Sequence, residues 1–410
     1  MIWQFALRYF RARKSTSAIN IIAWVSVGAI AVGTAALITV LSVFNGFTGL
    51  VKSLYSSFYP TLKVVPATGK TIILTASQLK EIIAIPGVAH YSQSIEEKAV
   101  LRFGNEQTIA VLKGVDTAFR SVAGLQDKIV RGRFDLSHEN GYQAIFGMGI
   151  ETALGVDVEH SLVPVNVYMP KRDANSNLNA ALPEQALNTG VIYPVGTFAI
   201  QQEFDSKYVL TDISFLRNLL NMSPGEMSSL ELSVKPGYSE KKVKRKVQEL
   251  LGDPVKVLTR VEQNATIYNV MQTEKWVVYV FLSFILVIAA FNMIGSLSML
   301  VIEKQKDITI LKAMGSRNSL VQRIFLTEGL IIAGAGSVLG FSLAITICLL
   351  QQHFGLVKLG GGSFLIDAFP VEMHLDDFIL VSVTILVIGV LASWYPAKRA
   401  ASQEIALKAT

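Results

Sequence analysis

Four long apolar runs constrain this chain more than any other feature of its sequence. A helix needs about 20 apolar residues to cross a bilayer, and such runs cover residues 19–45, 276–302, 324–350 and 378–395. Hydrophobic residues make up 51% of the chain and charged residues only 17%, whereas about a quarter of the residues in soluble proteins are charged. The sequence therefore predicts an α-helical membrane protein with four transmembrane helices.

The first apolar run could also be the core of a signal peptide. Residues 19–45 are, however, longer than the roughly 7–15 residues of such a core, and no A-x-A-like cleavage site follows them. An uncleaved helix is therefore expected.

Lysine and arginine near the helix ends predict how the chain is oriented. Residues 1–18 carry a net charge of +4 (four basic, no acidic), residues 303–323 carry +3 (five and two) and residues 396–410 carry +2 (three and one). Residues 351–377 carry −3 (one basic, four acidic). Both termini and residues 303–323 are therefore expected in the cytoplasm. The positive charge is a topology signal, and no nucleic-acid partner is needed to explain it.

The 230 residues at positions 46–275 are then expected outside the cytoplasm. Strand-like runs alternate with turns and at least two helical stretches, which predicts an α+β domain. We expect one α+β subdomain split between about residues 60–116 and 229–260, with a β-rich subdomain inserted at about 117–228. Helices are expected at residues 77–84, capped by Ser77, and at 239–251. Strands are expected at residues 62–65, 99–103, 109–112, 143–146, 163–168, 191–200, 208–211, 230–234 and 255–258.

Three short motifs carry a family resemblance. Residues 41–47 (LSVFNGF), 310–315 (ILKAMG) and 395–401 (YPAKRAA) resemble signatures of the LolC/LolE family, the permease subunits of lipoprotein-releasing ABC transporters in the MacB-like superfamily. The order of one helix, a large outer domain and three helices also agrees along the whole chain. Asp307 stands where the family usually has Glu. The resemblance implies a large α+β periplasmic domain inserted between helices 1 and 2.

The resemblance also implies a function and a set of partners. The chain would extract lipoproteins from the outer leaflet of the inner membrane and pass them to a periplasmic carrier, beside a second permease and in contact with membrane lipids. No G-x-x-x-x-G-K-[ST] phosphate loop occurs. The chain is thus expected to be a non-catalytic subunit without a cofactor, while a separate ABC ATPase binds ATP and Mg. The alternatives are an FtsX-type regulator of cell-wall hydrolases and a MacB-like efflux permease.

Residues 303–323 are the expected contact with the ATPase. Ile308, Leu311 and Met314 recur every third position, which favours a short amphipathic helix, and Gly315 follows it as a C-cap. Such a helix fits a groove on a partner, although it could instead lie on the membrane surface. The residues assigned to coupling are Asp307, Ile308, Leu311, Lys312, Ala313, Met314 and Gly315.

Two further groups of residues are candidates for packing and for substrate contact. Small residues allow helices to approach closely, either within this subunit or against a second permease; they are Ala29, Gly33, Gly336 and Gly340. Apolar side chains near the expected outer ends of the first two helices could line a cavity for acyl chains or simply face lipid. They are Leu41, Phe44, Phe47, Phe281 and Phe284.

Other polar residues are given no site. The five histidines show no metal-ligand spacing, and the single cysteine, Cys348, excludes a disulfide within the chain. Glu328 is an intramembrane acid to which the sequence assigns no role. Residues 1–18 are expected to form a helix at the membrane interface, and residues 171–185 are the place where a carrier-binding hook would lie.

Overall fold

The computed structural model describes residues 17–136, 141–159, 163–171, 187–358 and 368–403. The chain divides into two units. A helical unit takes its described residues from 17–50, 269–358 and 368–403, and an α+β unit takes them from 51–268. The interfacial helix predicted within residues 1–18 and the hook region at residues 171–185 lie almost wholly outside the described residues.

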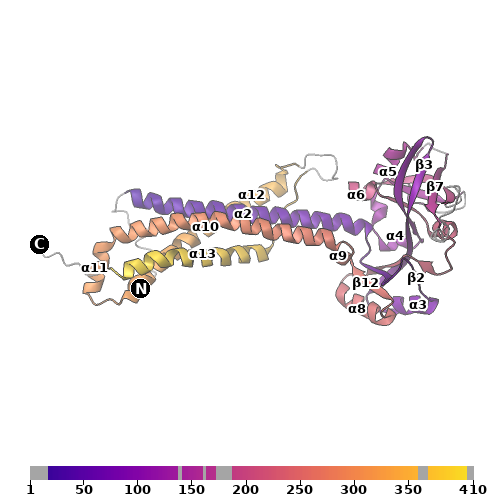
Figure 1. Cartoon of the computed structure of the whole chain (residues 1–410). Helices are drawn as coiled ribbons and strands as arrows, with labels where there is room; N and C mark the ends of the chain where they lie inside the picture. Colours follow the sequence, from indigo (N-terminus) through magenta and orange to yellow (C-terminus); the bar gives the residue numbers. More distant parts are fainter. Residues whose placement is uncertain (1–16, 137–140, 160–162, 172–186, 359–367, 404–410) are drawn as a thin grey trace, which may run out of the picture. The chain divides into compact units, whose positions relative to one another are not determined.

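The helical unit is built from four long helices and one short one. The short helix α11 (Gln305–Ala313) lies between α10 and α12 along the chain (Figure 1). The long helices are α2 (Ser17–Phe58), α10 (Ala265–Glu303), α12 (Asn318–Phe354) and α13 (Leu375–Ala401). Each long helix has the length and composition needed to cross a membrane. The prediction of four apolar transmembrane helices is confirmed.

Two of these helices run well past the expected apolar spans. α2 continues to Phe58 because Leu50, Leu54 and Phe58 are spaced by four residues and extend one buried face. The first proline after this face is Pro60. α10 begins at residue 265 rather than 276. Residues 265–275 continue the helix before the apolar span and include the polar residues Gln272, Glu274 and Lys275.

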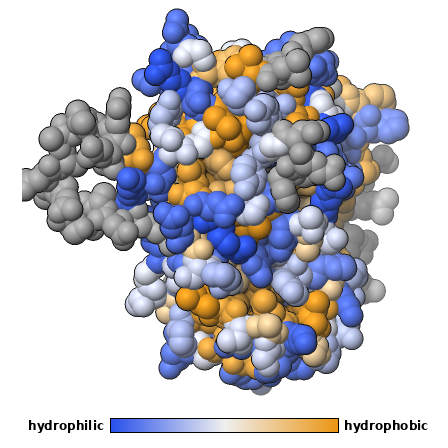
Figure 2. Space-filling model, turned by 90° about the vertical axis from the view of Figure 1, so that its right-hand side faces the viewer, coloured by the Kyte–Doolittle hydropathy of each residue, from blue (hydrophilic) through white to orange (hydrophobic). Residues whose placement is uncertain are grey.

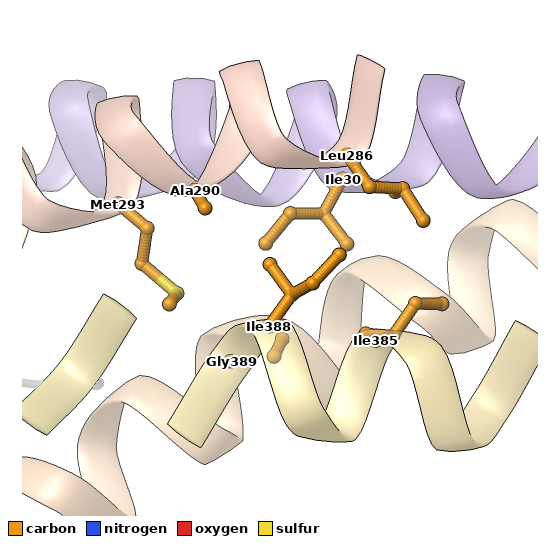
Figure 3. Close-up of a pocket in the computed structure, with 8 residues that line it drawn as sticks. Ile30, Leu286, Ala290, Met293, Ile385, Ile388 and Gly389 are labelled. Atoms are coloured by element: carbon orange, nitrogen blue, oxygen red, sulfur yellow. The ribbon is translucent and has the colours of Figure 1, made fainter. Parts of the chain in front are cut away.

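The helical unit has an apolar core, made of a large cluster shared by α2, α10, α12 and α13 and a smaller cluster that includes Ile308 of α11. A small apolar cavity within this core (Figure 3) is lined by Ile30, Leu286, Ala290, Met293, Ala333, Ile385, Ile388 and Gly389. Many of the remaining side chains on these helices are large, apolar and exposed. On α10 they include Val280, Phe281, Phe284, Ile288 and Phe291. A bundle with an apolar core and an apolar exterior matches a lipid environment.

Most strands of the α+β unit form one sheet in the part of the chain that the structure describes. Its ten strands follow the order β12-β1-β11-β3-β4-β9-β6-β8-β5, with β7 paired to β3 and β8. β2 and β10 form a separate pair. The strands are β1 (Leu62–Pro66), β2 (Ile72–Ile73), β3 (Val88–Phe103), β4 (Glu106–Val115), β5 (Ile129–Gly132), β6 (Gln143–Gly147), β7 (Val165–Pro170), β8 (Leu187–Phe198), β9 (Tyr208–Asp212), β10 (Glu226–Met227), β11 (Ser229–Val234) and β12 (Val255–Thr259). The predicted strands are present, and most of their ends are shifted by a few residues. β3 is longer than predicted, since it begins at Val88 rather than at residue 99.

The helices of this unit are short. They are α3 (Ala76–Ala84), α4 (Phe119–Val122), α5 (Met148–Leu154), α6 (Gln202–Asp205), α7 (Ile213–Leu219), α8 (Glu240–Leu251) and α9 (Arg260–Gln263). The prediction of Ser77 as the cap of α3 is wrong. Thr75 caps this helix in a capping box with Gln78, because the Gln78 side chain can reach back to the Thr75 backbone N–H.

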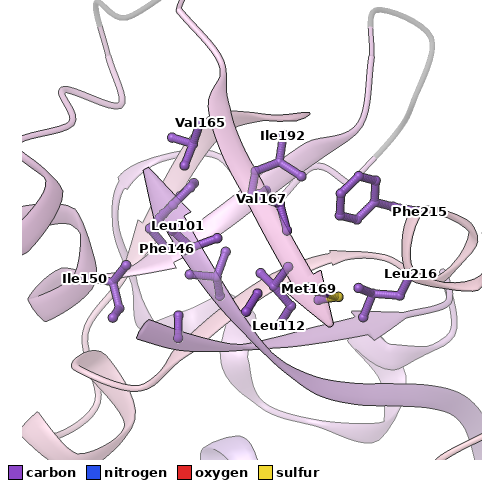
Figure 4. Packing of buried hydrophobic residues seen from close by; sticks show 14 of the residues in the cluster. Leu101, Leu112, Phe146, Ile150, Val165, Val167, Met169, Ile192, Phe215 and Leu216 are labelled. Atoms are coloured by element: carbon purple, nitrogen blue, oxygen red, sulfur yellow. The ribbon is translucent and has the colours of Figure 1, made fainter. Parts of the chain in front are cut away.

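Two hydrophobic clusters lie along the ten-stranded sheet. The larger one (Figure 4) includes Leu101, Leu112, Phe146, Val167 and Phe215. The second joins β1, β11 and β12 to α3 and α8 and contains buried residues of each element. Because one sheet runs past both clusters, the division into two subdomains stays a prediction. Hydrophilic and hydrophobic areas are interspersed on the face seen in Figure 2, as on ordinary water-exposed domains.

A buried ionic network crosses four strands of the sheet. Lys113 on β4 places its Nζ atom 2.7 Å from Oε1 of Glu231 on β11, and these side chains are 1% and 0% exposed. Glu96 on β3 lies 3.7 Å from the Lys113 ammonium and 2.7 Å from that of Lys63 on β1. Burial alone would raise the pKa of Glu96, but the two lysines outweigh it and lower that pKa to about 2. The network therefore stabilises the sheet in its charged form.

Candidate functional site: the coupling segment and the two ends of the helical bundle

The predicted coupling helix is present as α11, and its two ends are sharply defined. Lys304 is a single turn residue between α10 and α11, with a φ of −84° and a ψ of +13°. After α11, Gly315 adopts a φ of +87°, which favours glycine. The Gly315 and Ser316 amides donate to the carbonyls of Lys312 and Leu311, which closes the helix as a Schellman-type cap. α11 is therefore a short helix of its own between the two long helices α10 and α12.

The apolar face of α11 differs from the predicted one. Ile308 is 2% exposed and packs in a cluster that includes Ala397 and Ala400 of α13. Met314 is 79% exposed and Ile310 is 58% exposed. At 3.6 residues per turn, positions six apart lie about 120° away from each other, so Ile308 and Met314 cannot share one face. The free apolar face consists of Ile310, Ala313 and Met314.

Lys312 joins α11 to the last turn of α13. Its Nζ atom donates to the carbonyl oxygen of Ala401 at 2.7 Å and to that of Gln403 at 2.6 Å. The terminal carbonyls of a helix have no partner within the helix and carry partial negative charge. A lysine ammonium suits that position. Lys312, which the sequence assigned to ATPase contact, is thus engaged inside the chain.

A polar cluster lies at the opposite end of the bundle from α11. Lys275 on α10 places its Nζ atom 3.0 Å from Oδ1 of Asp377 on α13 and 2.9 Å from Oδ1 of Asn45 on α2. The Asn45 amide nitrogen donates to Oδ2 of Asp377 at 2.5 Å. This cluster was not predicted from the sequence. Two of its residues stand out in the sequence: Asn45 lies within the LSVFNGF motif, and Asp377 lies in the first turn of α13. Neither position indicates which residue it contacts.

The small residues pack against helices of the same chain. A Cβ atom on Gly336 would lie 2.8 Å from Ile30, and one on Gly340 would lie 2.5 Å from Thr34, so both glycines contact α2. A Cβ atom on Gly33 would lie 3.0 Å from Leu286 of α10. Ala29 is half-buried against the same core. Of the two alternatives left open by the sequence, packing within the subunit is the one observed.

The residues expected to line a lipid cavity do not form one set. Leu41 is fully buried in the core of the helical unit, so it cannot face a cavity between subunits. Phe44 and Phe47 are half-buried. Phe281 and Phe284 are 69% and 58% exposed, and they lie near the middle of α10 rather than at its end, because α10 begins at residue 265.

Two family models match the chain. The MacB-like periplasmic core domain matches residues 23–250, and the FtsX-like permease C-terminal domain matches residues 279–405. The lipoprotein-releasing system transmembrane protein LolC of Neisseria meningitidis serogroup B is 26% identical over 414 residues, covering 97% of this chain and 96% of that protein. The chain belongs to the LolC/LolE family of MacB-like permeases.

Other proteins similar to this chain match different shares of its length. The lipoprotein-releasing system transmembrane protein LolE of Haemophilus influenzae is 23% identical and covers 96% of this chain and 95% of that protein. Among solved structures, the periplasmic region of MacB from Actinobacillus actinomycetemcomitans is 14% identical, with a TM-score of 0.37, and covers 54% of this chain and 98% of that chain.

The LolC/LolE motifs occupy the two ends of the bundle. Lys312 of ILKAMG contacts Ala401, the last residue of YPAKRAA. Asn45 of LSVFNGF belongs to the polar cluster at the other end. Gly46, which follows it, lies so close to the backbone of Pro370 that no larger residue fits there. The motifs therefore mark contacts between helices that are distant in the sequence.

Glu328 is the remaining buried acid of the helical unit. It is 2% exposed, and its Oε2 atom has no hydrogen-bond partner within the described residues. Across the same residues, no group of three histidine, cysteine or acidic side chains is arranged to hold a metal ion.

Proposed function

We propose that this chain is the membrane-spanning permease subunit of an ATP-driven transporter that releases lipoproteins from the inner membrane. The observation that carries the proposal is the match, over nearly the full length, to transmembrane proteins named for lipoprotein release. The structure supports it with four helices suited to a membrane and a short helix set between two of them.

The proposal includes an orientation. The α11 end of the bundle is rich in lysine and arginine, which favours the cytoplasm. The ends that carry Asn45, Lys275 and Asp377 then lie on the periplasmic side of the inner membrane. The α+β unit, which lies between α2 and α10 in the chain, is placed in the periplasm, where it would meet the carrier that accepts the lipoprotein. Both termini are placed in the cytoplasm.

α11 is the proposed contact through which movement of the ATPase is transmitted to this chain. Ile310, Ala313 and Met314 form an exposed apolar face on a helix that is fixed to the bundle by Ile308 and Lys312. A groove on the ATPase would bury this face. ATP and Mg are assigned to that partner, because this chain lacks a phosphate loop. A second permease, either a paralogue or a copy of this chain, completes the membrane part.

The lipid-facing surface of α10 is the proposed contact for acyl chains. Transfer of each methylene out of an apolar environment costs about 0.8 kcal/mol, so an anchor with several acyl chains leaves the bilayer only if another apolar surface receives it. Phe281 and Phe284 are exposed on α10 and provide such a surface. Phe44 and Phe47 contribute less area, since they are half-buried.

Purification from native membranes tests the proposal. The tagged chain, extracted in mild detergent, should carry an ABC ATPase in stoichiometric amount and bound acylated lipoprotein, both identified by mass spectrometry. A complex that instead carries a cell-wall hydrolase or its activator, with no lipoprotein, would contradict the proposal.

A further inference from the structure

The polar cluster of Asn45, Lys275 and Asp377 joins three helices through one closed set of contacts. Each of the three side chains contacts the other two, at 2.5 to 3.0 Å. The Asp377 side chain is 7% exposed and that of Lys275 is 29% exposed. Charged hydrogen bonds shielded from water are strong when complete and costly when one partner is missing. Two states are therefore expected for this cluster, one with all of its contacts formed and one with them broken.

The segment before α13 is fastened to α2 beside this cluster. The Glu372 amide donates to the Ser42 carbonyl at 2.9 Å, and Asn45 Nδ2 also reaches the Glu372 carbonyl at 3.3 Å. Gly49 lies against the Glu372 side chain. The start of α13 and the end of α2 within the helical unit are therefore held together by the backbone as well as by Asp377.

The other end of α13 is fastened to α11. Lys312 donates to the carbonyls of Ala401 and Gln403, and Ile308 is buried in the same hydrophobic cluster as Ala397 and Ala400. α11 is separated from α10 by the turn at Lys304 and from α12 by the left-handed Gly315. α13 is one helix of 27 residues, or about 40 Å long. It thus connects the coupling helix to the polar cluster.

We propose that Asn45, Lys275 and Asp377 form a latch that holds the periplasmic ends of α2, α10 and α13 together at rest, and that α11 opens this latch by moving α13. The inference rests on the proposed function for its orientation and its ATPase. Hydrogen bonds weaken steeply once donor and acceptor separate beyond about 3.5 Å. A small displacement of α13 is enough to break the two contacts that Asp377 makes, which leaves α10 and α2 joined in this cluster only by the contact between Lys275 and Asn45. Opening would separate α2 from α10 beside Phe44 and Phe47, where an acyl chain could enter.

Spin-label distances on the whole transporter test the latch. Cys348 is the chain's single cysteine, so Cys348→Ala gives a background for labels at Thr273 of α10 and Leu375 of α13, two exposed positions near Lys275 and Asp377. Double electron–electron resonance in nanodiscs should give a short distance without nucleotide and a longer one with a non-hydrolysable ATP analogue.

Variants separate the latch from a general change in charge. Asp377→Asn should enlarge the long-distance population without nucleotide at least about fivefold, the lower end of typical coupling between sites. Asp376→Asn is the matched control, because Asp376 is the neighbouring acid in the same helical turn and is exposed. The control should leave the distances unchanged. The reversed pair Lys275→Asp with Asp377→Lys should restore the short distance.

Lys312→Met tests the connection through α13. It should keep the ATPase bound, while the nucleotide no longer lengthens the distance. The latch is overturned if Asp377→Asn gives the wild-type distances, and the role of α13 is overturned if Lys312→Met opens normally with nucleotide. A lipoprotein-release assay on the same samples isolates the proposed function. If the labels respond as predicted but the wild-type complex releases no lipoprotein, the proposed function fails while the latch stands.

Discussion

Gly340 of α12 lies directly against Thr34 of α2. A Cβ atom on residue 340 would lie 2.5 Å from the Thr34 Cβ atom and 2.6 Å from the Ala31 carbonyl oxygen. Thr34 turns its hydroxyl back to the Ile30 carbonyl at 2.7 Å, which leaves its carbon atoms facing the glycine. The close approach of these two helices therefore depends on a missing side chain.

Adding a single methyl group at this seam should destabilise the bundle. Gly340→Ala is expected to lower the free energy of unfolding by about 1–3 kcal/mol, as overpacking does in other cores. Gly334→Ala on the same helix meets no atom within 4 Å, and alanine favours helix over glycine by about 1 kcal/mol. SDS titration in mixed micelles should show opposite signs for the two variants. Equal effects would contradict the packing described here.

The buried pair of Lys113 and Glu231 should be essential for the sheet. Lys113→Met leaves an unpaired buried carboxylate, which typically costs about 3–5 kcal/mol. Hydrogen exchange of the β3, β4 and β11 amides in the full-length protein should accelerate by about a hundredfold or more. Lys70→Met is the control, because Lys70 is 79% exposed in its pair with Glu97, and exposed pairs contribute about 0–1 kcal/mol. If the amides of Lys113→Met exchange as slowly as those of the wild type, the buried pair does not contribute the predicted free energy.

Acid should weaken the same sheet through Glu96. Its pKa is lowered to about 2 in the folded protein, so its stabilising contribution is complete above its ordinary pKa and is lost as pH falls from that value toward 2. By pH 3 the loss should reach roughly 2 kcal/mol. Hydrogen exchange corrected for intrinsic rates at pH 5.5 and pH 3 measures it. The loss should disappear in Glu96→Gln and persist in Glu97→Gln.

The exposed face of α11 should bind the ATPase. Replacing Ile310 and Met314 together with Asp should abolish co-purification of the ATPase while the chain still inserts and folds, because both side chains are exposed. Lys306→Gln, on the same helix, should leave the complex intact, since an exposed charge contributes little. Ile308→Asp should instead reduce the amount of folded protein, because it places a charge in a buried cluster. A normal complex with the Ile310 and Met314 double variant would show that α11 is not the receiver.

Local sequence patterns predicted the elements well. Hydropathy identified the four long helices, because the requirement for a bilayer span is a property of one segment. The end of α11 was predictable for the same reason, since Gly315 supplies the left-handed residue that closes a helix. Polar strands were harder to find. Residues 88–98 of β3 include Ser92, Ser94 and Glu96, which become suited to a strand only through partners on β4 and β11.

Contacts between distant segments were not predictable from one sequence. The spacing of Ile308, Leu311 and Met314 indicates that α11 is amphipathic, but only the burial of Ile308 in a cluster with residues of other helices shows which part of the face is already occupied. The same holds for Asn45, Lys275 and Asp377. The periodicity of apolar residues predicts which face of a helix or strand is buried. It does not predict which residue of a distant segment a given side chain contacts.

ATP-driven release from proteoliposomes tests the central claim most directly. The chain, its ATPase and its partner permease would be reconstituted with a fluorescent acylated lipoprotein, and transfer to a soluble carrier would be followed with and without ATP. The account predicts transfer that requires ATP, that is lost in the Ile310 and Met314 double variant and that is retained in Lys306→Gln. A complex that hydrolyses ATP while all of the lipoprotein stays in the bilayer would contradict it.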